Sequence, residues 1–345
     1  MRKRPLFSPA ELKKRLSASA DQRQFVHDSR IQVQRILDGK DPRLLLIVGP
    51  CSIHDIIAAK EYATKLQRLS TQISDACLVI MRVFFEKPRT SNGWKGMLYD
   101  PFLNGTHDIS TGLLWARQLL LYLADLKLPA ATEFLDPITP NYYEDLISWA
   151  CIGARTSESQ VHRQIAAGLS MPVAFKNSTG GNLEVAVNGV ISAMSKHSYM
   201  GIDENGMVSE VITEGNRYAH IALRGGTKQP NYDSESIEMA LGLLRKAQLP
   251  ENILVDCSHD NSNRRLDQQI HVFQSVVNQI AEGNRKIKGL IMESHLYSGN
   301  QSLTNEPSAL QYAVSITDPC LDWKTTEELL LWAHQVMKKP LLVKV

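Results

Sequence analysis

Eight short runs of apolar residues punctuate the chain, and most are followed by a segment whose apolar residues have helical spacing. The runs are Leu44–Cys51, Cys77–Lys87, Ala130–Asp136, Trp149–Arg155, Pro172–Lys176, Ala219–Arg224, Ile253–His259 and Ile287–His295. They are continuous rather than alternating, which is typical of parallel strands covered on both faces. Eight strand–helix units predict an α/β fold, a TIM (β/α)8 barrel.

Helices are predicted between and around these runs. Their expected ranges are 57–69, 110–126, 141–148, 158–167, 182–196, 234–247, 264–282 and 326–337. In the first range, Ala58, Tyr62, Leu66 and Leu69 share one face. The main rival fold, an open doubly wound sheet, usually carries a glycine-rich phosphate loop after its first strand. The chain has no such loop, so the barrel is favoured.

Two additions to the barrel are expected. Residues 1–40 predict one or two helices outside the repeat, and residues 41–345 are expected to form the barrel. An inserted β-hairpin is expected at 199–215, because Asn205-Gly206 stands between two apolar runs.

Composition and charge narrow the class of protein. With 38 basic and 36 acidic residues among 345, the net charge of +2 gives no reason to expect nucleic-acid or membrane binding. No apolar run is long enough to span a bilayer, and the N-terminus does not resemble a secretory signal. The five cysteines are widely spaced and odd in number, which argues against a disulfide framework and favours the cytoplasm.

A divalent metal site is predicted from four residues at or beyond strand ends. Reactive groups of a TIM barrel lie at the carboxyl ends of its strands. Cys51, His259 and Glu293 end predicted strands, and Asp318 follows in a loop. Such a mixed soft and hard donor set suits Mn, Fe, Co or Zn. Taken alone, Cys51 is more often a buried apolar filler; the joint placement favours the metal site.

A set of cations at the same strand ends predicts an anionic substrate. Its members are Arg82, Lys87, Arg89, Arg155, Lys176 and Arg224. Arginine and lysine seldom lie at buried strand ends unless they are paired, and the arginine fork matches phosphate and carboxylate oxygens. The alternative is that they pair with structural acids such as Asp136 or Glu158. As a set they exceed the predicted acids, so a substrate with more than one anionic group is expected.

Several sequence motifs resemble those of the feedback-regulated microbial type I 3-deoxy-D-arabino-heptulosonate-7-phosphate (DAHP) synthases. The matching stretches include GPCSIHD at 49–55, EKPRTSNGWKG at 86–96, GARTSESQ at 153–160, LRGGTKQPNY at 223–232, DCSHDNSNR at 256–264 and SITDPC at 315–320. The resemblance extends over about residues 40–325. It implies condensation of phosphoenolpyruvate with erythrose 4-phosphate, at the start of the shikimate pathway, with release of phosphate.

The resemblance also implies roles for individual residues. Cys51, His259, Glu293 and Asp318 match the metal ligands, with Mn or Fe favoured. The expected substrate-binding residues are Arg82, Lys87, Pro88, Arg89, Thr90, Glu133, Ala154, Arg155, Lys176 and Arg224. Lys87 is expected to protonate the aldehyde oxygen, and His259 and Cys51 complete the predicted catalytic set. The role of Glu133 stays open.

Regulation by an aromatic amino acid is expected from the same resemblance. The matching effector positions are Pro140, Ser170 and Gly201. Gly201 lacks the hydroxymethyl group that phenylalanine-responsive members tend to carry, which favours tyrosine. The resemblance also implies that residues 1–40 are a regulatory or oligomerisation extension of a catalytic barrel at 41–345, and that the protein is a homodimer or homotetramer. Asp260 departs from the small residue common in the family, with a role that the sequence leaves open.

Two other functions compete with this interpretation. One is the related 3-deoxy-octulosonate 8-phosphate synthase, which uses arabinose 5-phosphate; Lys87-Pro88-Arg89-Thr90 and the N-terminal extension speak against it. The other is a catalytically dead sensor of aromatic amino acids, which the intact metal and cation sets disfavour.

Overall fold

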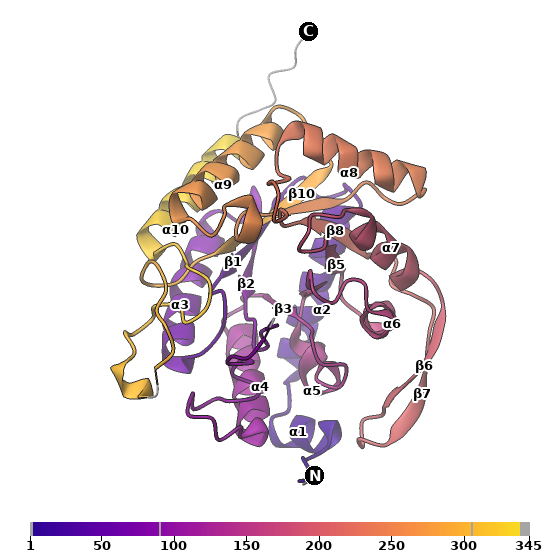
Figure 1. Cartoon of the computed structure of the whole chain (residues 1–345), viewed down its shortest axis with the longest axis vertical. Coiled ribbons are helices and arrows are strands. Elements are labelled where there is room, and N and C mark those ends of the chain that lie inside the picture. The colour runs from indigo at the N-terminus through magenta and orange to yellow at the C-terminus, as the bar shows by residue number, and fades with distance from the viewer. Residues whose placement is uncertain (1–2, 90, 305, 339–345) are drawn as a thin grey trace.

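Eight parallel strands close into a barrel with helices around it (Figure 1). The computed structural model describes residues 3–89, 91–304 and 306–338. The barrel strands are β1 (Leu44–Gly49), β2 (Cys77–Arg82), β3 (Ala130–Glu133), β4 (Trp149–Ile152), β5 (Val173–Lys176), β8 (His220–Leu223), β9 (Ile253–Asp256) and β10 (Ile287–Glu293). Because β1 pairs with both β2 and β10, the sheet has no edge. The predicted TIM barrel is confirmed.

Helices follow the strands as predicted, with one difference. They are α3 (Ile56–Gln72), α4 (Ile109–Asp125), α5 (Pro140–Tyr143), α6 (Gln160–Gly168), α7 (Glu184–Ala193), α8 (Ser234–Lys246), α9 (Leu266–Ala281) and α10 (Trp323–Lys338). The helix expected at 141–148 is only the four-residue α5 followed by the 3₁₀ turn η1 (Glu144–Leu146). Two further 3₁₀ turns are η2 (His259–Asn261) and η3 (Pro307–Ala309). Among the described residues, no helix combines the length and apolarity that crossing a membrane requires.

Most strands end earlier than their apolar runs. β2 ends at Arg82 although the run continues to Lys87, and β9 ends at Asp256 rather than His259. Phe84 and Phe85 beyond β2 are buried, at 1% and 0% exposure, without being part of the ladder. The apolar runs in the sequence therefore indicate which residues are buried, and not where the hydrogen-bonded strands end. As a result, many predicted site residues lie on loops just past the strands.

The second of the two N-terminal helices closes the opposite end of the barrel, and the first packs outside it against α5. α1 (Pro9–Arg15) and α2 (Ala20–Leu37) each begin with a capping box, at Ser8 and Ser19. The last turn of α2 packs Ile36 and Leu37 into a core cluster with the barrel-interior side chains of β1. With this end filled by apolar side chains, the carboxyl ends of the strands remain for a site.

The predicted hairpin insertion is confirmed as β6 (His197–Ile202) and β7 (Val208–Thr213). It reaches along the side of the barrel to α1 (Figure 1). At its tip, the Ala10 N–H donates to the Glu204 carbonyl at 2.7 Å, and Lys13 Nζ lies 2.8 Å from Glu204 Oε1. The hairpin and the N-terminal helix thus hold each other in place.

Candidate active site

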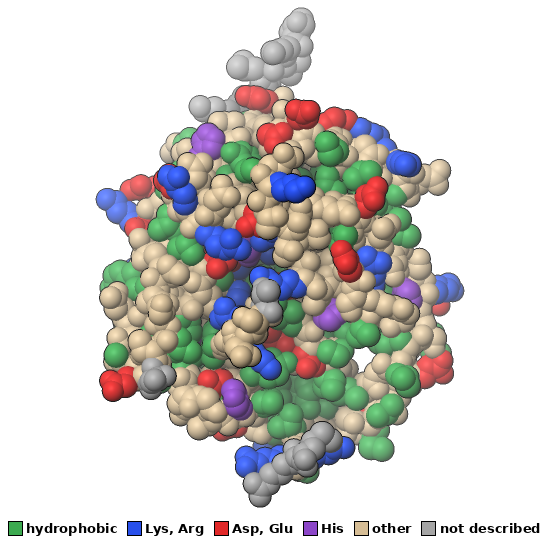
Figure 2. All heavy atoms as spheres, viewed as in Figure 1, with side chains coloured by type: hydrophobic (Ala, Val, Ile, Leu, Met, Phe, Trp, Pro, Cys, Tyr) green, Lys and Arg blue, Asp and Glu red, His purple; other side chains and the backbone are tan. Residues whose placement is uncertain are grey.

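A cavity opens at the carboxyl ends of the barrel strands, and nearly all predicted site residues lie at it. Its wall consists of Cys51, Lys87, Pro88, Arg89, Glu133, Ala154, Arg155, Lys176, Arg224, His259, Arg264, Thr317 and Asp318. Figure 2 shows basic side chains gathered around a hollow near the centre of this face. Arg82 and Glu293 adjoin the cavity from the fully buried interior. Thr90 lies outside the described residues. Arg264 and Thr317 were not predicted.

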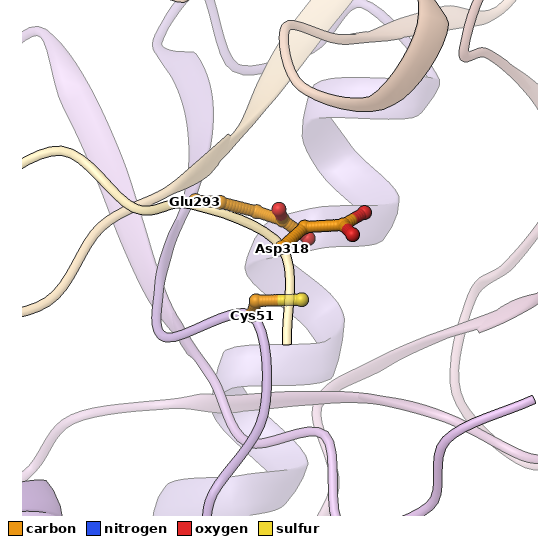
Figure 3. A group of neighbouring side chains, drawn as sticks. All are labelled: Cys51, Glu293 and Asp318. Atoms are coloured by element: carbon orange, nitrogen blue, oxygen red, sulfur yellow. The ribbon is translucent and has the colours of Figure 1, made fainter. Parts of the chain in front are cut away.

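The predicted metal ligands converge at one side of this cavity. Figure 3 shows Cys51, Glu293 and Asp318 pointing toward one another from three separate segments. One ligand atom of each lies within 4.8 Å of the others. His259 Nε2 is 3.7 Å from Glu293 Oε1, so the imidazole faces the same group. The sequence could not show this convergence, because 267 positions separate Cys51 from Asp318.

A buried oxygen atom without a hydrogen-bond partner is a second indication that the cluster binds a cation. Glu293 Oε2 is buried and has no hydrogen-bond partner among the residues that the structure describes. Buried polar atoms are nearly always paired, so an unpaired carboxylate oxygen in a ligand cluster indicates a place for an external partner. A thiolate, an imidazole and two carboxylates are suitable donors for a divalent transition metal.

Lys87 and Cys51 are electrostatically linked. Lys87 Nζ donates to the Cys51 carbonyl at 3.0 Å and lies 3.4 Å from Cys51 Sγ. Burial lowers the pKa of the Lys87 amine, but Cys51 and Glu293 outweigh it, so the pKa lies above its ordinary value. Burial, aided by Glu293, raises the pKa of the Cys51 thiol to about 11. Lys87 is therefore protonated near neutral pH, as a proton donor must be.

Asp256 orients two of the predicted residues at once and was missed by the sequence interpretation. It lies 2.8 Å from Lys176 Nζ and 3.1 Å from His259 Nδ1. Burial alone would lower the pKa of the Lys176 ammonium; Asp256 outweighs it and raises that pKa to about 12. A carboxylate on Nδ1 leaves Nε2 free to face the metal cluster. The position of Asp256 at the end of a predicted strand could have identified it as a site residue from the sequence.

Three of the predicted cations, Arg82, Lys176 and Arg224, pair with acids other than the expected ones. Arg82 pairs with Glu293 at 2.9 Å, and Arg224 pairs with Asp260. The expected partner Asp136 instead accepts a hydrogen bond from Tyr99. Counting Arg264, seven described cations at the site face the five carboxylates Glu133, Asp256, Asp260, Glu293 and Asp318. The surplus of two agrees with an anionic ligand.

Glu86 anchors the loop that carries Lys87 and Arg89. Its carboxyl group is fully buried and accepts hydrogen bonds from the Asp136 N–H at 3.1 Å and the Thr139 hydroxyl at 3.0 Å. Burial, reinforced by the Asp136 carboxylate, raises the Glu86 pKa to about 7. The sequence did not single out Glu86 within the motif at 86–96, because its partners Asp136 and Thr139 are about 50 residues away in the chain.

The three predicted effector positions lie on the hairpin side of the barrel. Pro140 begins α5, and Ser170 Oγ accepts a hydrogen bond from Arg30 Nη1 at 2.8 Å. Gly201 lies on β6, where an added Cβ would approach Val211 Cγ2 to 2.8 Å. Figure 2 shows an opening between the hairpin and the body of the barrel. These positions are therefore separate from the active-site cavity.

A closed (β/α)8 barrel with a metal-ligand cluster in a basic cavity defines a class: a metal-assisted enzyme for small anionic substrates. The sequence profile of the DAHP synthetase I family matches residues 18–331. The chain belongs to this family.

Individual relatives support the assignment over nearly the whole chain. The Tyr-sensitive phospho-2-dehydro-3-deoxyheptonate aldolase of Escherichia coli K12 is 46% identical over 340 residues, covering 99% of this chain and 95% of the relative. The Trp-sensitive enzyme of the same strain is 46% identical over 324 residues, covering 94% and 92%. The solved structure of the aldolase from Francisella tularensis SCHU S4 superposes with a TM-score of 0.95 at 41% identity, covering 97% of this chain and 98% of that one.

Proposed function

We propose that this chain condenses phosphoenolpyruvate with erythrose 4-phosphate to give DAHP and phosphate, with a divalent metal ion. The observation that carries the proposal is that the four predicted metal ligands, Lys87 and a surplus of cations all lie at one cavity. Neither rival function explains that meeting together with full-length similarity to phospho-2-dehydro-3-deoxyheptonate aldolases.

Phosphoenolpyruvate is held by the cations on the barrel side of the cavity. Arg82 Nη1 is buried and has no partner within 3–89, 91–304 and 306–338, and Lys176, Arg155 and Arg224 line the wall. These fixed positive groups bind the carboxylate and phosphate and orient C3 of the substrate toward the aldehyde. Glu133 Oε1 is buried and has no hydrogen-bond partner in the described part of the chain, so it is an acceptor for a substrate hydroxyl or a water.

Erythrose 4-phosphate lies toward Pro88 and Arg89, with Arg89 at its phosphate. Lys87 donates a proton to the aldehyde oxygen as C3 of phosphoenolpyruvate forms the new carbon–carbon bond. Water then adds to C2, and the C–O bond to phosphate breaks. The proton of that water leaves with the phosphate. His259, held by Asp256 at Nδ1 and facing the ligand cluster with Nε2, acts by fixing the metal rather than by carrying that proton.

Cys51, His259, Glu293 and Asp318 would hold the metal, for which we favour Mn or Fe. When bound, the ion supplies Lewis acidity toward the aldehyde oxygen.

The experiment that tests this function measures phosphate release from phosphoenolpyruvate by the purified protein. Release is expected only with erythrose 4-phosphate, and a chelator should abolish it until Mn²⁺ is restored. Release with arabinose 5-phosphate instead would favour the octulosonate synthase. No release with either aldose, together with tight binding of an aromatic amino acid, would favour the sensor.

An aromatic amino acid, tyrosine, is the proposed feedback inhibitor. The curated relatives include Tyr-sensitive and Trp-sensitive enzymes at the same identity, so overall similarity does not choose between them. Gly201 supports tyrosine because it lacks the hydroxymethyl group of phenylalanine-responsive members. A phenol oxygen beside it would require the Val211 side chain to move, since Val211 Cγ2 lies 2.8 Å from where a Cβ would stand. Inhibition by Tyr, Phe and Trp, each assayed alone, tests this choice; strong inhibition by Phe only would refute it.

Association into a dimer or tetramer is proposed through the N-terminal helices and the hairpin. The outward face of the hairpin carries Met200, Val208 and Ile212, which are 88%, 76% and 74% exposed. Neighbouring exposed apolar side chains of this kind mark interaction surfaces. Light scattering of the wild type and of Val208→Lys tests it; a monomeric wild type would refute it.

A further inference from the structure

The segment from His259 to Arg264 holds its side chains at the cavity on an unusual backbone. His259, Asn263 and Arg264 have φ angles of 55°, 49° and 55°. Residues other than glycine rarely adopt this left-handed conformation, and such strain persists at functional sites where the surroundings enforce it.

Neighbouring loops enforce this conformation. Asn261 Nδ2 donates to the Leu223 carbonyl at 3.1 Å and to the Asp256 carbonyl at 2.9 Å, so the segment is tied to β8 and β9. Gly225 has a φ of 77°, and a Cβ on it would lie 2.4 Å from the Asn261 nitrogen. The segment is thus pressed against the loop that carries Arg224.

Four side chains form a continuous chain of ion pairs across the mouth of the cavity. Asp260 Oδ2 pairs with Arg224 Nη1, and Asp260 Oδ1 lies 3.2 Å from Arg264 Nη1. Arg264 Nε in turn lies 3.5 Å from Asp318 Oδ2. At one end of this series of ion pairs, Arg224 is a proposed phosphoenolpyruvate-binding residue. At the other end, Asp318 is a proposed metal ligand.

Building on the proposed function, we propose that Asp260 and Arg264 are positioning residues that couple substrate binding at Arg224 to metal binding at Asp318. A substrate phosphate at Arg224 competes with Asp260 for the guanidinium group. Asp260 then pairs more fully with Arg264, which loosens the hold of Arg264 on Asp318. Asp318 becomes more available to the metal, so each ligand strengthens binding of the other.

The test compares phosphoenolpyruvate and Mn²⁺ binding by calorimetry, each with and without the other, in the wild type and in Arg264→Asn. Asparagine suits the positive φ at this position and removes the cation. We expect Mn²⁺ alone to bind the variant more tightly, because Asp318 is released. The factor by which phosphoenolpyruvate tightens Mn²⁺ binding should fall about threefold or more.

Arg265→Asn is the matched control, since Arg265 carries the same charge but pairs with Asp267 at 2.7 Å, outside the cavity. It should leave the coupling factor unchanged. Asp260→Asn interrupts the series of ion pairs at its centre, so it should reduce the coupling factor as Arg264→Asn does. The variant with both substitutions should show no further reduction of that factor.

Equal coupling in the wild type and Arg264→Asn would overturn the inference. If the wild type bound neither ligand, the proposed function itself would fail. If it bound both with unaltered coupling in the variants, only the role of Asp260 and Arg264 would fail.

Discussion

Arg82 and Glu293 form an ion pair of 2.9 Å with side chains that are 0% and 1% exposed, and each keeps one polar atom without a partner among the described residues. The pair joins the end of β2 to the end of β10. Each partner neutralises the other in the buried interior, while Arg82 Nη1 and Glu293 Oε2 are available to the proposed substrate anion and the proposed metal cation.

Replacing Arg82 should therefore reveal the metal site in a stability measurement. Arg82→Met leaves Glu293 buried without its cation, and we expect the unfolding free energy of the metal-free protein to fall by about 3–5 kcal/mol. Bound Mn²⁺ would supply a positive charge to Glu293, so the loss should shrink with the metal present. Urea unfolding with and without Mn²⁺ measures both values.

Arg117→Met is the control for that prediction. Arg117 is equally buried and pairs with Asp145 at 2.7 Å, away from the cavity. Its loss of stability should be the same with and without Mn²⁺. If Arg82→Met lowers the unfolding free energy by the same amount with and without Mn²⁺, the assignment of Glu293 as a metal ligand would be contradicted.

Lys87→Met tests the proton donor. The variant loses the only proposed acid for the aldehyde oxygen, so kcat should fall by about 100- to 10,000-fold. Lys95→Met is the control, because Lys95 is an exposed lysine on the same loop. Steady-state kinetics measures kcat for both variants and the wild type. Near-full turnover by Lys87→Met with both substrates bound would exclude Lys87 as the proton donor.

Glu86 should make stability depend on pH. Between its ordinary pKa of 4.5 and the folded value of about 7, the folded protein binds more protons at Glu86 than the unfolded chain does. Stability from this group therefore falls as pH rises, by about 3 kcal/mol across that window. Glu86→Gln should remove this part, which urea unfolding at pH 5 to 8 measures. Parallel pH curves for the two proteins would contradict it.

Gly201→Ser should weaken inhibition by tyrosine. The new side chain needs Val211 to move, and its hydroxymethyl group takes the space assigned to the phenol oxygen. We expect the inhibition constant for tyrosine to rise about tenfold, a loss of about 1.4 kcal/mol, with the KM values unchanged. Ser198→Ala, on the outward face of the same strand, is the control. An unchanged inhibition constant would remove Gly201 from the effector site.

The sequence predicted the barrel because its strands are buried on both faces and read as continuous apolar runs. It predicted strand ends poorly where burial continues past pairing, as at Phe84 and Phe85. It missed Asp256 and Glu86, since a buried carboxylate is recognised by what lies across the fold from it, not by its neighbours in the chain.

By itself, the sequence determined which residue types stand at each strand end and, through its motifs, the family. The tertiary structure decided how they combine. It brings Cys51 within reach of Asp318, pairs Arg82 with Glu293, and shows that Asp260 bridges Arg224 and Arg264. The physical reason is barrel closure: pairing of β1 with β10 makes neighbours of residues from the two ends of the fold, and no local pattern encodes which charges then face each other.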